Sequence, residues 1–220
     1  MKTEVVTIDG PTSSGKNSVG FLLAQKLGYQ YIDTGMIYRV GTYLVLKNNI
    51  PLNNVSQITE FFKNLNLEIK NSNGGLKILN DGEDLTDILH SPDVTNNVSA
   101  VSAIRQVREV TKVIQRKLGE SKNTVMTGRD IGSEIFPEAK HKFFLTAEVM
   151  VRAKRRFDQL KKTDLSIELD SVLQSMLERD KKDSTRQVSP LRIPEGAVVI
   201  DNSNLSIEQT VAKMLKQIYA

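Results

Sequence analysis

The sequence predicts an α/β domain in which a parallel central sheet is wrapped by helices. Short apolar runs of strand type alternate along the chain with longer stretches of helical periodicity. Such alternation is typical of parallel sheets, because a helix returns the chain from the end of one strand to the start of the next. With 220 residues, 39% of them hydrophobic, the chain is long enough for one such domain with a packed core.

The first unit runs from an apolar strand at residues 5–8, through Asp9 and a glycine-bearing loop, to a helix with apolar residues at Val19, Leu22, Leu23 and Leu27. Further strands are expected at 124–126, 142–145 and 197–200, because each run is short, apolar and separated from the others by helical stretches.

Two regions interrupt this alternation. Strand-like runs at 67–70 and 76–79 flank the turn-forming residues 71–75, so we expect a β-hairpin inserted into the domain at 66–89. Residues 152–186 are rich in Lys and Arg and contain two helical patterns, after which Pro190 is expected to end the helical run.

Composition narrows the function classes. The chain has no cysteine and two histidines, which excludes disulfides and thiolate metal sites and makes a zinc site a poor interpretation. The opening segment has no apolar run of signal-peptide or membrane-span length, so we expect a cytoplasmic protein with no membrane association. A net charge of +4 suits a small anionic ligand as well as a nucleic acid.

The loop after the first strand predicts a phosphate-binding site of the P-loop type. It lies between a strand and a helix, as that motif requires, and it differs from the G-x-x-x-x-G-K-[ST] pattern at one position. Its backbone N–H groups and the following helix favour anions, and Lys16 adds a mobile positive charge for the β- and γ-phosphates of ATP. We expect ATP to bind Gly10, Pro11, Thr12, Ser13, Ser14, Gly15, Lys16, Asn17 and Ser18.

The departure from the pattern is Asn17, which stands where a hydroxyl would bind magnesium. Ser18, one residue later, carries a hydroxyl and is the predicted protein ligand for Mg²⁺. No Asn-Lys-x-Asp string occurs in the chain, which argues against a guanine-specific GTPase.

Further strings resemble the bacterial cytidylate kinase family of nucleoside monophosphate kinases. They occur in the family's order from about residue 8 to about residue 207: Asp-Thr-Gly-Met-Ile-Tyr-Arg at 33–39, Gly-Glu-Asp-Leu-Thr at 82–86, Asp-Val at 93–94, Val-Arg-Glu at 107–109, Gly-Arg-Asp-Ile-Gly at 128–132, and Asp-Ser-Thr-Arg followed by Ser-Pro-Leu at 183–191. The resemblance implies ATP-dependent phosphorylation of CMP and dCMP.

The same resemblance implies roles for individual residues. Thr34, Arg39, Arg129 and Arg186 would bind the monophosphate of the acceptor, since guanidinium groups match phosphate oxygens. Ser99, Arg108 and Asp130 would lie near the cytosine, with Asp130 accepting from its amine, and Arg179 and Asp183 would lie by the sugar. Tyr38 either contacts the acceptor or packs beneath this clamp.

The resemblance also divides the single domain, residues 1–220, into parts. The core would comprise 1–34, 103–151 and 166–220, and the monophosphate-binding part with its insert 35–102. A helical lid at about 152–165 would carry the cations Arg152, Arg155 and Arg156 to the transferring phosphoryl group. Together with Lys16, Arg129 and Arg186 these form the expected catalytic set, in a monomeric enzyme.

Transfer between two phosphates needs alignment and charge neutralisation rather than a general base. The family usually has an aspartate where this chain has Thr127, and together with Asn17 this departure indicates weakened magnesium binding. Three alternatives therefore stay open: a kinase for UMP, a catalytically weakened nucleotide-binding regulatory protein, and an RNA-binding module suggested by the pI of about 9.2. Only 5% of residues are aromatic, which argues against the last.

Overall fold

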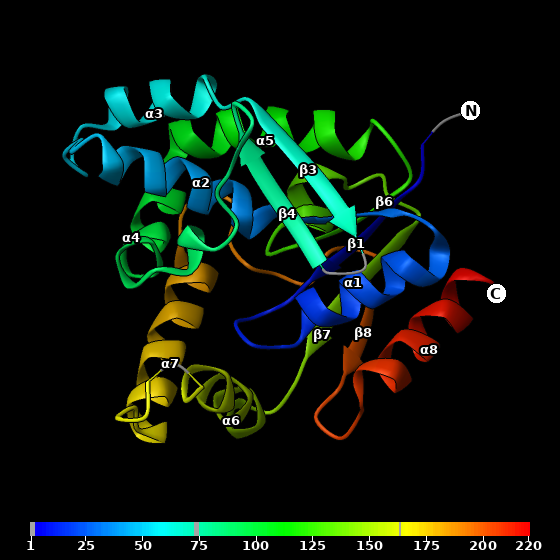
Figure 1. The fold of residues 1–220 in the computed structure, drawn as a ribbon. Coiled ribbons are helices and arrows are strands. Elements are labelled where there is room, and N and C mark those ends of the chain that lie inside the picture. Colours follow the sequence, from blue (N-terminus) through cyan, green and yellow to red (C-terminus); the bar gives the residue numbers. More distant parts are fainter. Residues whose placement is uncertain (1–2, 73–74, 163) are drawn as a thin grey trace.

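A five-stranded parallel sheet forms the centre of the molecule (Figure 1). The computed structural model of the chain describes residues 3–72, 75–162 and 164–220. In the order β2-β6-β1-β7-β8, the strands are Gln30–Asp33, Thr124–Gly128, Val5–Asp9, His141–Thr146 and Val198–Asp201. The predicted parallel sheet is thus confirmed. Strand β2 was not singled out by periodicity because it has only four residues, with a polar residue at each end.

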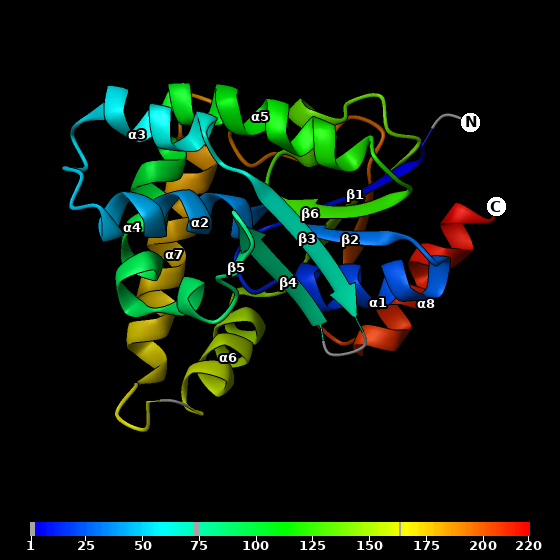
Figure 2. The ribbon, with the colours of Figure 1, turned by 45° about the horizontal axis from the view of Figure 1, so that its top comes forward.

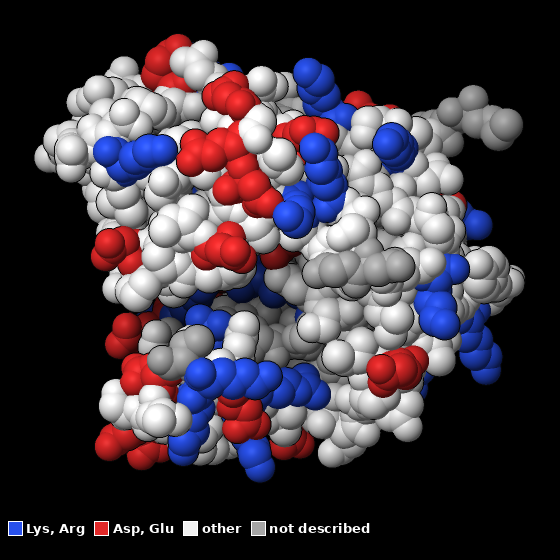
Figure 3. Space-filling view, viewed as in Figure 1, with Lys and Arg blue, Asp and Glu red and all other residues white. Residues whose placement is uncertain are grey.

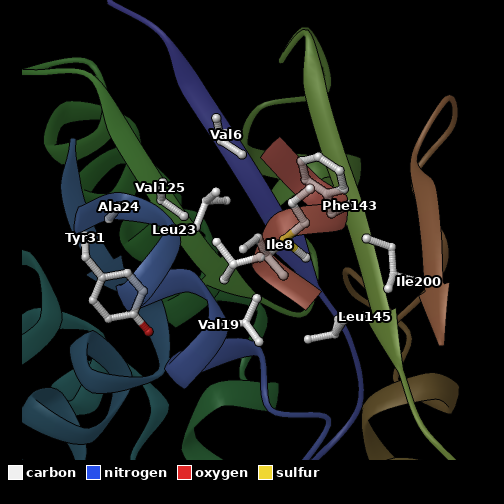
Figure 4. Close-up of a cluster of buried hydrophobic side chains, with 12 residues drawn as sticks. Val6, Ile8, Val19, Leu23, Ala24, Tyr31, Val125, Phe143, Leu145 and Ile200 are labelled. Atoms are coloured by element: carbon white, nitrogen blue, oxygen red, sulfur yellow. The ribbon is translucent and has the colours of Figure 1, made fainter. Parts of the chain in front are cut away.

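Helices cover both faces of the sheet. Helix α1 (Lys16–Leu27) and helix α8 (Ile207–Ile218) lie on one face, and α5 (Arg105–Gly119) lies over the other (Figure 2). The central strand β1 is buried along its whole length, and Val6 and Ile8 pack against α1 (Figure 4). Since side chains alternate along a strand, Val5 joins the opposite cluster.

The predicted hairpin is present as part of a separate antiparallel sheet. Strand β3 (Leu67–Ser72) pairs with β4 (Gly75–Asn80), with Ile69 opposite Ile78. Of the predicted turn, residues 73 and 74 lie outside the described residues. A third strand, β5 (Glu83–Asp84), was not predicted, because it has only two residues and both are charged.

This small sheet packs on helix α2 (Thr34–Lys47), whose Met36 and Val40 contact Ile78 and Leu89 in one buried cluster. It is also joined to the central sheet by one side chain. The Asn71 amide accepts a hydrogen bond from the Tyr31 backbone N–H at 2.8 Å and donates one to the Tyr31 carbonyl at 3.0 Å. A side chain of β3 therefore pairs with the backbone of the edge strand β2.

Helices α3 (Val55–Lys63) and α4 (Pro92–Ala103) pack with α2 and α5 around Phe62 and Val98. A 3-10 turn, Ile88–His90, precedes α4, and a π-helical turn, Ile131–Ile135, follows β6.

The basic region forms two helices, as predicted: α6 (Val149–Leu160) and α7 (Leu169–Thr185). The first begins three residues before the expected lid at 152–165, and residue 163 of that range lies outside the described residues. The second ends at Thr185, before Pro190, because Arg186 adopts an extended conformation. Among the helices within the described residues, none combines the length and apolar character needed to cross a membrane.

Candidate active site

A cavity of about 750 Å³ opens at the carboxyl ends of the parallel strands. Its walls come from the loop after β1, the start of α2, residues 128–130 after β6, helices α6 and α7, and residues after β8. Figure 3 shows the hollow, with Lys and Arg side chains inside it. This end of a parallel sheet is where open α/β folds bind ligands, because loops from separate strands converge there.

The predicted phosphate loop has the backbone that the motif requires. Gly15 has a φ of 85°, a left-handed conformation that favours glycine, and it directly precedes α1. At Gly10 an added Cβ would lie 2.2 Å from the Leu145 carbonyl oxygen, so only glycine fits against β7. The two glycines at the ends of the loop are therefore dictated by conformation and by close approach.

Side chains from distant elements hold this loop in place. Asp180 accepts a hydrogen bond from the Thr12 N–H at 2.9 Å, and Arg152 donates to the Thr12 carbonyl at 2.9 Å. Asn202 donates to the Ser14 carbonyl at 3.0 Å. Neither Asp180 nor Asn202 was predicted from the sequence. Asn202 directly follows β8 at the ligand-binding edge, which is a usable signal, whereas Asp180 lies mid-helix and has none.

The Lys16 side chain is buried against the phosphate loop. Its Nζ donates to the Pro11 carbonyl at 3.2 Å, and the side chain lines the cavity. Burial, and next the charge of Arg129, hold the pKa of Lys16 well below its usual value. An anion in the cavity would offset both effects, so the charge around Lys16 favours the binding of phosphate.

The two unusual residues, Asn17 and Thr127, contact each other. The Thr127 hydroxyl donates to the Asn17 amide oxygen at 3.3 Å, and the Asn17 amide nitrogen donates to Asp33 at 2.5 Å. Asp33 and Ser18 both line the cavity. Hard oxygen donors of this kind fit a divalent cation held mainly by phosphates and water. Within the described residues there is no cluster of three or more acidic, His or Cys side chains that could hold a metal alone.

At the other end of the cavity, Asp130 is buried between two arginines. Arg108 forms an ion pair with it, and the Arg186 guanidinium lies 3.6 Å from its second oxygen. The Tyr38 ring lies beneath Arg108, with the guanidinium carbon 5.4 Å from the ring centroid. Tyr38 therefore packs under this group, while one edge also lines the cavity.

Arg129 connects the two ends of the cavity. Its Nε donates to Asp183 at 2.8 Å, and its Nη2 donates to the Thr12 hydroxyl of the phosphate loop at 3.2 Å. The Asp183 carboxylate is thus held by Arg129. Burial, and next Arg129, lower the pKa of Arg179 to about 10. Within the described residues the Arg179 Nε is buried without a hydrogen-bond partner.

Thr34, the first residue of α2, and Arg39, in its second turn, also line the cavity. The Thr34 hydroxyl donates to the Thr127 carbonyl at 2.8 Å. Ser99 is not among the residues that line the cavity, although Val98 and Ser102 of the same helix are. Those two positions lie one turn apart on one face of α4, and Ser99 lies beside that face.

The lid arginines differ in environment. Arg155 and Arg156 line the cavity, and Arg155 donates to the Asn202 carbonyl at 2.9 Å. Arg152 is buried behind the phosphate loop in an ion pair with Asp180 and is not part of the cavity wall. The position of Arg152 thus does not support its expected role at the transferring phosphate. Its side chain instead holds the phosphate loop.

A buried carboxylate fixes the loop that follows β6. Asp9, at the end of β1, accepts hydrogen bonds from the backbone N–H groups of Ile131 and Gly132, both at 2.8 Å. Burial raises the pKa of Asp9 to about 7 against the lowering effect of these bonds. Asp9 therefore holds in place the segment that carries Arg129 and Asp130.

Comparison with known proteins gives consistent matches. The family model described as "Cytidylate kinase" matches residues 6–220. A cytidylate kinase of Caldicellulosiruptor saccharolyticus is 43% identical over 219 residues, covering 100% of this chain and 97% of that protein. The cytidylate kinase of Bacillus subtilis is 38% identical, covering 97% and 95%. An uncharacterized protein from Eubacterium ventriosum, of known crystal structure, shares the fold, with a TM-score of 0.54 at 13% identity and 99% coverage of both chains.

Proposed function

The chain belongs to the cytidylate kinase family, and we propose that it transfers the γ-phosphoryl group of ATP to CMP and dCMP, giving CDP and dCDP. The observation that carries this proposal is that a single cavity joins a phosphate loop to a cluster of guanidinium groups from separate helices. A phosphate loop alone would fit many nucleotide hydrolases. A second group of cations facing it fits a second phosphate, which is what a phosphoryl acceptor supplies.

The donor end would bind the phosphates of ATP. The loop at 10–18 and the positive end of α1 would present backbone N–H groups to these phosphates. Lys16 adds a positive charge, and its pKa would rise as phosphate binds. Arg155 and Arg156 approach from α6, so they would complete the shell around the γ-phosphate. Arg152 would act indirectly, by holding the loop through Thr12.

The acceptor end would bind the nucleoside monophosphate. We propose that Arg39, Arg129 and Thr34 hold its phosphate, because all three line the cavity near the phosphate loop. Asp130, positioned by Arg108, would accept from the cytosine amine, and Arg186 lies on the same side of the cavity. Asp183, with Arg179 near it, would bind the sugar, and a movement of α4 would bring Ser99 to the base.

The reaction would be a direct transfer without a covalent intermediate. The acceptor phosphate is already anionic, so the protein has to align two phosphates and neutralise the charge that accumulates between them. Lys16 and Arg129 are placed for this, because Arg129 contacts the loop and the acceptor end at once. Mg²⁺, held by phosphates, water and the Ser18 hydroxyl, would supply further charge neutralisation.

We further propose that the parts predicted from sequence move as units. The insert-bearing part at 35–102 and the lid at about 152–165 would close over the nucleotides and exclude water. In keeping with the family resemblance, the enzyme would act as a cytoplasmic monomer in pyrimidine nucleotide metabolism.

A coupled assay of ADP release tests the proposal. With ATP and Mg²⁺, the enzyme is assayed against CMP, dCMP, UMP, AMP and GMP, with a control that lacks acceptor. We expect ADP to appear fastest with the two cytidine monophosphates. Fastest turnover with UMP would change the substrate assignment, and nucleotide binding without acceptor-dependent turnover would favour a regulatory protein weakened at Asn17 and Thr127.

Asp130→Asn tests the assignment of the base. The amide keeps the size of the side chain but places a donor beside the cytosine amine, so we expect the preference for CMP over UMP to fall by about 10²-fold. Unchanged discrimination, measured as the ratio of kcat/KM values, would remove Asp130 from the base site.

A further inference from the structure

The cavity contains a histidine that the proposed function leaves unused. His90 closes the 3-10 turn Ile88–His90 and lines the same cavity as the phosphate loop. Its imidazole forms no hydrogen bond or ion pair with any residue in the described part of the chain, whereas His141, the other histidine, lies 3.4 Å from a Glu4 oxygen. His90 is an exposed residue that lines a cavity rich in cations, so its ring is accessible to a ligand there.

The turn that carries His90 is tied to the arginine proposed to bind the acceptor phosphate. Arg39 donates through Nη1 to the Leu89 carbonyl at 2.7 Å and to the Thr95 hydroxyl at 3.0 Å. These bonds use one nitrogen of the guanidinium, and no hydrogen bond of its Nε or Nη2 occurs within the described residues. Arg39 and His90 both line the cavity, and the charge of Arg39 acts on the imidazole.

Charged groups around His90 come from every element near it. Arg39 on α2 and Arg156 on α6 place positive charge beside the ring, while Asp33 before α2 and Asp87 on the same turn place negative charge there. Helix α4, which follows His90, lies on one side of the hollow, and helix α6, which carries Arg156, lies on the other (Figures 1 and 3). An anion between these walls would meet His90 from one side and Arg156 from the other.

We propose that His90 is an additional phosphate-binding residue, which contacts the anion held by Arg39. The inference deepens the proposed function and rests on it for the identity of the phosphate, namely that of the acceptor nucleotide. The expected contact is a charge-assisted hydrogen bond from the imidazolium to a phosphate oxygen.

This contact couples phosphate binding to proton uptake. Burial, and next the charge of Arg39, lower the pKa of His90 below its usual value, so the ring is mostly neutral at pH 7 without a bound anion. A bound phosphate dianion stabilises the imidazolium and raises that pKa. Up to one proton then passes from solvent to the ring as the ligand binds. Binding becomes tighter as the pH falls from the pKa of the bound state to that of the free state.

The test is an NMR titration of the two imidazoles in the intact enzyme. With only two histidines, the spectrum gives one titrating signal for His90, which His90→Gln removes, and one for His141 as an internal control. Spectra are recorded from pH 5 to 8 without ligand, with CMP and with inorganic tripolyphosphate. We expect the midpoint of His90 to rise by about one pH unit or more with a phosphate ligand while that of His141 stays constant.

Kinetics supply a second readout. The acceptor phosphate itself titrates near pH 6, so the variant is compared with the parent at each pH. In His90→Gln we expect the KM for CMP to rise about tenfold at pH 6 and about threefold at pH 8, with kcat nearly unchanged. His141→Gln, which removes an imidazole outside the cavity, should leave this KM unchanged.

The outcomes separate this inference from the proposed function. An enzyme that binds CMP with a shifted His90 signal but forms no ADP would refute the kinase and keep the phosphate contact. An active kinase whose His90 midpoint is the same with and without CMP would refute the contact and keep the kinase. Failure of both CMP and tripolyphosphate to move the signal at saturating concentration would overturn the inference.

Discussion

The two ends of the cavity are built differently. At the proposed donor end the binding groups belong to one continuous loop, and its carbonyl and N–H groups at Thr12 and Ser14 are held by Asp180, Arg152 and Asn202 from outside. At the proposed acceptor end the binding groups are long side chains from several helices and from the segment after β6. They pair with carboxylates that also line the cavity, as Arg129 does with Asp183.

This difference indicates which groups determine ligand specificity at each end. A backbone loop binds phosphate through its shape, so a change in one outer side chain should affect it only moderately. The acceptor end depends on individual guanidinium and carboxylate groups, so single substitutions there should alter which nucleotide binds. Lys16 and Arg129 lie where the two ends meet, and changes there should affect the transfer itself.

The largest effect is expected at that meeting point. Lys16→Met removes the charge nearest the transferring group and keeps the length of the side chain, so kcat should fall by roughly 10³-fold. The thermal midpoint should not fall, because the parent carries the cost of burying the ammonium. A loss of kcat below about tenfold would show that the two ends work without a shared charge.

A smaller effect is expected at the acceptor end alone. Arg39→Gln should raise the KM for CMP by about thirtyfold, because it removes charge-assisted hydrogen bonds to phosphate, and should leave the KM for ATP within about twofold. Arg105→Gln is the matched control, since Arg105 pairs with Glu109 on the exposed side of α5. Equal losses for both substrates would contradict the separation of the two ends.

At the donor end, an outer support should matter less than a side chain in the cavity. Asp180→Asn keeps the shape of the residue but removes the ion pair with Arg152 and weakens the bond from the Thr12 N–H. We expect the KM for ATP to rise about fivefold and the KM for CMP to stay constant, as measured by initial rates. The opposite pattern would place Asp180 with the acceptor end.

A last effect concerns the stability of the fold rather than the reaction, and it involves Asp9, which supports the acceptor end from below. Its pKa is about 7 in the folded protein against 3.8 as the reference, so the folded state keeps a proton that the unfolded state has lost. The free energy of unfolding should therefore decrease by about 1.4 kcal/mol per pH unit from about pH 4 to 7 through this group. Asp9→Asn should flatten the dependence of the free energy of unfolding on pH in this range. Urea unfolding at a series of pH values measures it. The same slope in the variant and the parent would exclude Asp9 as the cause.

The same contrast explains how much the sequence could predict. The strand, loop and helix at the donor end are contiguous, so the loop at 10–18 and four of the five parallel strands follow from local pattern. The acceptor residues come from separate elements and were identified through family resemblance. The partners of these residues could not be predicted, because Asp183 lies near Arg129, Arg179 and Arg186 at once and only the packing of α7 decides which one it binds.

The hydrogen bonds between Asn71 and Tyr31 have a consequence for the molecule in solution. Strand β2 is the edge of the central sheet, and an open edge can pair with the edge of another molecule and start aggregation. The Asn71 amide occupies both the N–H and the carbonyl of Tyr31, as a neighbouring peptide group would. The insert therefore also shields the edge of the sheet, and its loss would expose a surface prone to intermolecular β-pairing.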